Sequence, residues 1–205
     1  MKIKFFITHY TPLVERKQNM IQQLEKYGIT NVEFIENYDR ELLTDQDICK
    51  FASIKMSEIS LFLKHIEVFN REMDTDDIFV ILEDDAIFVD DFLNKLNQYI
   101  EEINQHDWDI LFSGDCCNLH IDGYKMSDEK HIYKDYRGRG TCMYVLNKEV
   151  CKKLRYIICS ETNICEPIDH WFNYVIVKYG LRSFWSEPTL VSQGSEIGVF
   201  NSAIR

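Results

Sequence analysis

The opening of the chain alternates between short apolar runs and apolar positions at helical spacing. Residues 2–8 form a short apolar run, which predicts a strand. Residues 15–27 carry apolar side chains at helical spacing, and Gly28 supplies a signal for the helix to stop. Residues 32–35 then return to a strand-like pattern. A β-α-β unit of this kind favours a parallel sheet with a right-handed crossover.

A second helix and a strongly apolar strand follow. Ser57 is a suitable N-cap for a helix that runs to about Arg71, and the apolar residues that nearly surround this helix predict that much of it is buried. Residues 78–82 are all apolar, so the strand that they predict has no polar face, as in a central strand covered on both sides. This run ends abruptly at three acidic residues, 83–85, which we call the acidic triplet.

The rest of the chain predicts further α/β elements with a weaker pattern. They are a helix capped by Asp90 or Asp91, strands at 109–112 and 140–146, helices at 148–156 and 170–179, and short strands at 183–185 and 189–191. Residues 115–138 are polar and aromatic without a clear pattern. Because no linker, repeat or low-complexity segment divides the chain, we expect one α/β domain over residues 1–205.

Composition and charge exclude several classes of function. A 45% share of hydrophobic residues, with only 8 Gly and 3 Pro, argues for a folded globular protein rather than a disordered or fibrous one. The formal net charge of -11 and the lack of a basic run argue against a nucleic-acid partner. No apolar stretch is long enough for a transmembrane segment, and the first residues resemble a buried strand rather than a secretory signal. We therefore expect a cytoplasmic protein.

The number and spacing of the cysteines are also consistent with a cytoplasmic protein. There are seven, an odd number, and their spacings match no zinc pattern. Two of them, Cys116 and Cys117, are neighbours in the chain. We expect free thiols in a reducing environment, several of them packed as small apolar residues.

The acidic triplet carries the most chemical information in the sequence. Side chains alternate along an extended chain, so Glu83 and Asp85 leave on one side and Asp84 on the other. Two carboxylates about 7 Å apart at the backbone can meet at one cation or one ligand. Ligands of open α/β sheets also bind beyond the carboxyl ends of the strands. The alternative is an acidic loop that only faces solvent.

Residues 80–86, which contain the triplet, resemble the acidic motif of glycosyltransferase family 25, which includes lipopolysaccharide-type and procollagen galactosyltransferases. Other parts of the chain are similar to further family segments in the same order. They are Ile7-Thr8 with Glu15-Arg16, Tyr38-Asp39, residues 57–60 with Lys64-His65, residues 140–146, residues 167–171 and residues 188–193. No single segment is decisive, but six in the same order are fairly specific.

This resemblance implies a GT-A-like, Rossmann-like fold with a mixed sheet flanked by helices. It implies one glycosyltransferase domain, with a donor and metal half at about residues 1–114 and an acceptor and base half at about residues 115–205. The implied reaction moves a hexose, galactose or glucose, with inversion from UDP-galactose or UDP-glucose to a hydroxyl of a glycan or a collagen-like protein. The implied cofactor is Mn²⁺ or Mg²⁺, hard cations that carboxylate oxygens suit.

The resemblance also implies roles for individual residues. Asp85 is the expected direct metal ligand, and Glu83 either joins it or, like Asp84, reaches the donor ribose or a metal-bound water. An inverting transfer needs one general base for the acceptor hydroxyl, which we assign to Asp169. The other residues expected to bind the donor are Thr8, His9, Arg16, Asp39, His65 and Arg139.

Structural alternatives stay open for several of these residues. Asp169 precedes a predicted helix, where an aspartate commonly serves only as an N-cap. Arg16 could be a solvated helix residue, and Arg139 could lie in an exposed turn. His65 shares a helix face with apolar residues, a position typical of a core histidine.

The sequence departs from the family pattern at three places. Ser57 replaces a glycine of the family, and Lys64 replaces a serine. Lys64 could add positive charge near the donor or point to solvent. No histidine follows residue 170 to act as a C-terminal metal ligand, so the replacement would have to be Gln193, Ser195 or Glu196.

Two other functions compete with sugar transfer. A metal-dependent phosphate hydrolase would need a nucleophilic aspartate after the first strand or a histidine-rich ligand set, and residues 8–10, Thr-His-Tyr, offer no such aspartate. A degenerate transferase kept as a binding or structural protein is the other candidate. The intact acidic triplet and Asp169 argue against that loss of activity.

Overall fold

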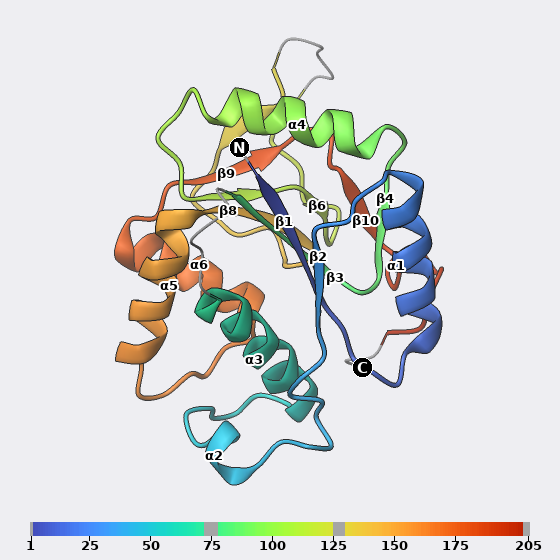
Figure 1. Cartoon of the computed structure of the whole chain (residues 1–205). Coiled ribbons are helices and arrows are strands. Elements are labelled where there is room, and N and C mark those ends of the chain that lie inside the picture. Colours follow the sequence, from blue (N-terminus) through green and yellow to red (C-terminus); the bar gives the residue numbers. More distant parts are fainter. Residues whose placement is uncertain (1, 72–77, 125–129, 203–205) are drawn as a thin grey trace.

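The protein folds around a seven-stranded mixed sheet with helices on both faces (Figure 1). The computed structural model describes residues 2–71, 78–124 and 130–202. The strands of this sheet are β1 (Ile3–Thr8), β2 (Val32–Ile35), β3 (Ile78–Glu83), β5 (Ile110–Phe112), β7 (Ile132–Lys134), β8 (Met143–Asn147) and β9 (Ser183–Ser186). Their order is β2-β1-β3-β8-β5-β9-β7. Because β1 is parallel to β2 and β3 whereas β8 is antiparallel to its neighbours, the expected mixed α/β sheet is confirmed.

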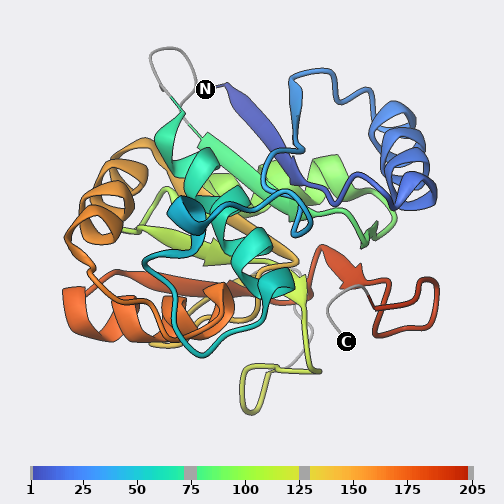
Figure 2. The same ribbon diagram turned by 90° about the horizontal axis from the view of Figure 1, so that it is seen from below.

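The helices cover the two faces of this sheet and fill two hydrophobic cores (Figure 2). They are α1 (Val14–Lys26), α2 (Asp45–Ile48), α3 (Met56–Asn70), α4 (Phe92–Ile103), α5 (Lys148–Ser160) and α6 (Ile168–Tyr179). One core contains residues of α3, α5 and α6, and the other contains residues of α1 and α4. Within the described residues, no helix combines the length and apolar character that a membrane span requires.

The central strand β3 contributes to both cores. Phe79 and Ile81 belong to the core with α3, α5 and α6, whereas Val80 and Leu82 belong to the core with α1 and α4. Successive side chains of a strand point to opposite faces, so a strand buried on both sides must be apolar throughout. This confirms the prediction made from the apolar run.

A second, three-stranded sheet begins directly after the acidic triplet. Its order is β4-β10-β6, where β4 is Ala86–Phe88, β6 is Gly114–Asp115 and β10 is Val191–Gln193. The backbone N–H of Gly194 donates to the carbonyl oxygen of Asp85 at 2.8 Å. The small sheet therefore brings the turn after β10 next to the triplet, although about 110 residues separate them in the chain.

The predicted element boundaries need several corrections. Helix α3 begins at Met56 with Lys55 at the N-cap position, so Ser57 does not cap it. Asp91 occupies the N-cap position of α4, but in a left-handed conformation and without a side-chain cap hydrogen bond. The strand predicted at 140–146 starts later, at the first residue of β8. Strands β4, β6 and β7 lie where the pattern predicts none.

Replacing Asp109 by asparagine should destabilise the fold by about 2 kcal/mol at pH 7. The Asp109 carboxylate, at the start of β5, accepts hydrogen bonds from Arg182 at 2.9 Å and Lys153 at 2.8 Å. Burial alone would raise the pKa of Asp109, but these hydrogen bonds outweigh it and lower the pKa to about 2. The stabilisation is complete above the unfolded pKa of 3.8 and is lost as the pH falls through about 2.

Urea unfolding of wild type and Asp109→Asn between pH 7 and pH 2 measures this difference. The gap between the two proteins should narrow as the pH falls below about 4. Asp107→Asn is the matched control, because the Asp107 side chain also pairs with Arg182, at 3.3 Å, but is 95% exposed. Equal losses in both variants would contradict the role given to Asp109.

Candidate active site

The acidic triplet lies at the carboxyl end of β3, and its side chains diverge as the alternation predicts. Asp84 is directed toward the segment that follows β1. Its carboxylate is 2.8 Å from His9 Nδ1, accepts from the Tyr10 N–H at 3.1 Å, and pairs with Arg16 Nη1 at 2.8 Å. These buried contacts join the ends of β1 and β3 to α1.

Glu83 and Asp85 meet different partners. Thr141 Oγ1 donates to Glu83 Oε1 at 2.6 Å, just before β8. Asp85 Oδ2 is 3.4 Å from the Ser195 N–H and 3.7 Å from Arg16. The other oxygen, Asp85 Oδ1, is buried and has no hydrogen-bond partner within the described residues. A buried carboxylate oxygen without a donor is costly, and a bound cation would satisfy it.

The electrostatics of this pair indicate a shortage of positive charge. Burial, followed by the nearby Asp85 carboxylate, raises the pKa of Glu83 to about 8. Burial also raises the pKa of Asp85. Two carboxyl groups that resist ionisation at one strand end fit a site that a divalent cation completes.

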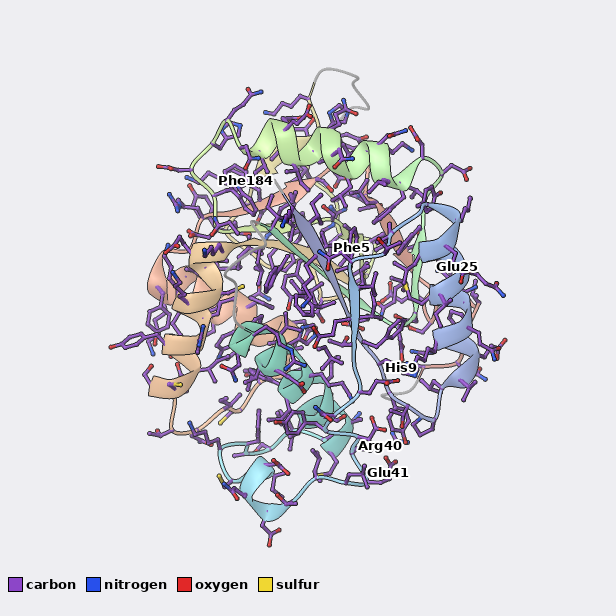
Figure 3. The ribbon with its side chains drawn as sticks, in the orientation of Figure 1. Phe5, His9, Glu25, Arg40, Glu41 and Phe184 are labelled. Atoms are coloured by element: carbon purple, nitrogen blue, oxygen red, sulfur yellow. The ribbon has the colours of Figure 1, made fainter. Side chains whose placement is uncertain are left out.

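A small cavity lies beyond the ends of β1 and β3, next to the start of α3. Its wall includes five of the residues expected to bind the donor, and two further basic side chains also line it. The five are Thr8, His9, Arg16, Glu83 and Asp84, and the two are Arg40 and Lys64. His9 lies just past the end of β1, and Arg40 lies on the loop near it (Figure 3). We call this cavity the basic cavity.

Lys64 and Asp39 form a buried ion pair beside the basic cavity. Lys64 Nζ is 2.9 Å from Asp39 Oδ1, and both side chains are almost completely buried. Asp39 also accepts hydrogen bonds from the backbone N–H and the hydroxyl of Thr11. Lys64 lines the cavity, so it does not point to solvent. Asp39 was expected to bind the donor, and the structure shows it holding Lys64 and the segment after β1.

A larger cavity, of about 340 Å³, lies on the other side of Glu83. Its lining includes four carboxylates and, within the described part of the chain, neither lysine nor arginine. The four acidic residues are Glu58, Glu83, Asp169 and Glu196. We call it the acidic cavity. It shares Leu61 and Glu83 with the basic cavity, so the two meet at the triplet.

Asp169 faces the acidic cavity from the first turn of α6. Pro167 holds the N-cap position of this helix, and no side-chain cap hydrogen bond is formed there. The reading of Asp169 as an N-cap is therefore wrong. Its side chain is 40% exposed, which leaves it accessible to a ligand, and its charge contributes to the raised pKa of Glu83.

Two residues that were expected at the donor lie in the interior instead. His65 is fully buried, with Nδ1 2.7 Å from the Tyr144 hydroxyl, and burial lowers its pKa to about 3. Arg139 is also fully buried and pairs with Glu187 at 2.9 Å. These two assignments are corrected, because neither side chain lines the basic cavity or the acidic cavity.

The sequence reasoning missed several residues that complete the site. Thr141 holds Glu83, and Ser195 reaches Asp85 from the turn after β10. Figure 1 shows this C-terminal segment, in red, near α1, and the carbonyl of Asn201 accepts a hydrogen bond from Arg16 at the start of that helix. The signal for this contact is weak, because it depends on a small sheet with strands of two or three residues.

The folded protein should lose stability as the pH rises, because of Glu83. Between the usual pKa of 4.5 and the raised value of about 8, the folded protein binds a proton at Glu83 that the unfolded chain has released. Stability therefore falls across this range. Glu83→Gln cannot lose a proton, so it should remove a fall of about 3–4 kcal/mol in the free energy of unfolding between pH 5 and pH 8.

Urea unfolding at pH 5 and pH 8, without divalent cations, measures this effect. Glu166→Gln is the matched control, because Glu166 is an exposed carboxylate just before α6 and should leave the pH dependence of wild type intact. Parallel pH profiles for wild type and Glu83→Gln would show that Glu83 does not take up the proton.

Comparisons with known proteins show to which family the chain belongs. Residues 2–172 match the family described as glycosyltransferase family 25 (LPS biosynthesis protein). No curated protein sequence matches the chain significantly.

Several solved structures resemble the chain at low sequence identity. Galactosyltransferase LgtC in complex with donor and acceptor sugar analogs is 14% identical, over 75% of this chain and 59% of that chain, with a TM-score of 0.44. A glycosyltransferase involved in the glycosylation of the major capsid of PBCV-1 is 11% identical, over 94% of both chains, with a TM-score of 0.43. S. aureus TarS is 11% identical, over 100% of this chain and 67% of that chain, with a TM-score of 0.44.

The family match runs from β1 into α6 and so includes the strand ends, the acidic triplet and Asp169. The mixed sheet of this chain, flanked by helices, is the GT-A-like arrangement that the resemblance to a glycosyltransferase implied. The chain therefore belongs to glycosyltransferase family 25.

Proposed function

We propose that this glycosyltransferase moves a hexose, galactose or glucose, with inversion from a UDP-sugar to a hydroxyl of a glycan or protein acceptor. The observation that carries the proposal is the meeting at Glu83 of two cavities, one with three basic side chains in its wall and one with four carboxylates. The basic cavity suits the nucleotide diphosphate, and the acidic cavity, with Asp169 in its wall, suits the sugar and the acceptor hydroxyl.

The basic cavity answers an electrostatic difficulty. A nucleotide sugar brings a diphosphate to a protein whose formal net charge is -11. Arg16, Arg40 and Lys64 line the cavity where the ends of β1 and β3 meet, each paired with a carboxylate that holds it in place. A guanidinium fork matches phosphate oxygens. Arg16 is held by Asp84, so its position is fixed before the donor arrives.

Asp85 and Glu83 are the residues that would hold Mn²⁺ or Mg²⁺. The unpartnered Asp85 oxygen and the raised pKa of Glu83 support this assignment, and both residues offer the hard oxygen ligands that these cations prefer. A divalent cation bound there would neutralise negative charge on the departing diphosphate. Thr141 would orient Glu83 toward this site through its hydrogen bond.

Asp169 would act as the general base. In a single displacement, the acceptor hydroxyl attacks the anomeric carbon while a carboxylate accepts the hydroxyl proton. Asp169 lies in the first turn of α6, faces the acidic cavity and is free of a capping role. Its 40% exposed side chain leaves room for an acceptor to approach.

Thermal unfolding with a panel of nucleotide sugars tests this proposal. UDP-galactose, UDP-glucose and GDP-mannose would each be added with Mn²⁺, with Mg²⁺ or with EDTA. We expect a UDP-sugar to raise the melting temperature by several degrees only when metal is present, since ligand at 100 times its Kd stabilises by about 2.7 kcal/mol. Stabilisation by no nucleotide sugar would overturn the proposal and favour a degenerate transferase. Equal stabilisation in EDTA would overturn the metal assignment alone.

A further inference from the structure

Two thiols and a carboxylate converge in the wall of the acidic cavity. They belong to Cys116 and Cys117, directly after β6, and to Glu196, in the turn after β10. One ligand atom from each residue lies within 4.8 Å of the other two. Cys117 and Glu196 are exposed and Cys116 is half-buried, so the group is open to the cavity.

Three of the distances at this cluster are close to the edges of a tetrahedron around zinc. Bonds of about 2.3 Å to sulfur and about 2.0 Å to oxygen give edges of about 3.8 Å between two sulfurs and about 3.5 Å between sulfur and oxygen. The two Sγ atoms are 4.0 Å apart, and Cys117 Sγ is 3.5 Å from Glu196 Oε1. Gln193 Oε1 is also 3.5 Å from Cys116 Sγ and supplies a fourth donor.

The backbone holds this arrangement without a metal. Cys117 has a positive φ of 55°, which turns the chain so that two adjacent side chains converge instead of diverging. The Cys117 N–H donates to Glu196 Oε2 at 2.9 Å, which leaves Oε1 facing the thiols. In the turn after β10, the Glu196 N–H donates to the carbonyl oxygen of Gln193 at 2.9 Å.

We propose that Cys116, Cys117, Gln193 and Glu196 form a second metal site, for a thiophilic dication such as Zn²⁺. Sulfur ligands select zinc-like cations, whereas the carboxylates of Asp85 and Glu83 suit Mn²⁺ or Mg²⁺, so the two sites differ in chemistry and share no ligand. The proposal goes beyond sugar transfer and does not depend on it.

Binding at this site exchanges protons for the metal. As each sulfur–zinc bond forms, the thiol releases its proton to water, so one Zn²⁺ displaces two protons from Cys116 and Cys117. Affinity should therefore rise with pH. The bound ion would tie the segment after β6 to the turn after β10, which also carries Ser195 beside Asp85. A metal ion bound to these four residues would hold in place the wall of the acidic cavity that they form.

Cobalt is a suitable probe because it replaces zinc and reports its ligands by absorption. Co²⁺ would be titrated into the reduced full chain, after a thiol assay confirms that all seven cysteines are free. We expect a 1:1 complex with an intense near-ultraviolet band from thiolate coordination and visible bands typical of a tetrahedral ion, both lost when Zn²⁺ is added. Cys117→Ser should weaken the thiolate band, since only the Cys116 sulfur then remains, and Glu196→Gln should weaken binding by more than about tenfold.

Cys159→Ser is the matched control, because Cys159 is an exposed free thiol on α5, away from the cluster. It should keep the full cobalt spectrum. Absence of a thiolate band in wild type, or an equal band in Cys117→Ser, would overturn the proposal. Loss of the band in Cys159→Ser would place the metal elsewhere and overturn it too. Because absorption does not depend on sugar transfer, failure here leaves the proposed function standing, and failure of the nucleotide panel leaves this site standing.

Discussion

Asp85→Asn should lower the rate of sugar transfer by about a thousandfold, because it removes the carboxylate placed to bind the metal. Asp85 Oδ1 is buried at the end of β3 with no hydrogen-bond partner within the described residues. An amide is a poorer ligand for a hard cation and carries no charge to hold it. Turnover with a UDP-sugar at saturating Mn²⁺, together with Mn²⁺ affinity from calorimetry, measures the effect. The turnover rate and the Mn²⁺ affinity should both fall in the variant.

The fold should survive this substitution. The buried apolar part of β3 ends at Leu82, and asparagine has nearly the size of aspartate. Burial raises the pKa of Asp85, so loss of this carboxyl should leave the free energy of unfolding unchanged or higher in the absence of metal. Asp90→Asn is the matched control, because Asp90 is fully exposed and its loss should leave transfer unchanged. Wild-type turnover in Asp85→Asn would remove Asp85 from the mechanism.

The sequence predicts the first half of the fold well because local signals agree there. The apolar runs and helical spacing of residues 2–35 correspond to β1, α1 and β2, and the run at 78–82 corresponds to β3. The small sheet of β4, β10 and β6 was missed, because strands of two or three residues have no period to detect. Their pairing depends on contacts between distant parts of the chain.

The candidate site was predicted only where local sequence signals determine it. Alternation along an extended strand was enough to separate Asp84 from Glu83 and Asp85. Local sequence cannot show which charged side chains become buried, because their partners are far away in the chain. Arg139 and Glu187 form such a pair in the interior, whereas a charged turn predicts a surface position.

The cysteine cluster illustrates a further limit. Spacing rules for zinc look for two cysteines with about two to four residues between them, so adjacent cysteines do not match the pattern. Here the left-handed conformation of Cys117 brings both thiols to one place, and β10 brings Glu196 to meet them. Neither the conformation nor the pairing of β10 with β6 is visible in the residue pattern.

Asp169→Asn should lower kcat by about a hundredfold to ten-thousandfold while leaving the affinity for the UDP-sugar nearly unchanged. Asparagine keeps the size of the side chain but cannot accept the acceptor proton. Asp169 lines the acidic cavity and is absent from the lining of the basic cavity, where we place the nucleotide. Transfer rates and donor binding, measured separately, distinguish a base from a donor-binding residue.

Charge alone must be separated from proton transfer in this experiment. Glu166→Gln removes one carboxylate near the start of α6, as Asp169→Asn does, but Glu166 lies outside the acidic cavity lining. It should retain turnover within about twofold of wild type, since an exposed charge is screened by solvent. Equal losses of turnover in both variants would mean that negative charge near the start of α6 matters, and not proton transfer to Asp169. A collapse of donor affinity in Asp169→Asn with kcat preserved would place Asp169 at the donor and leave the acceptor proton to another group.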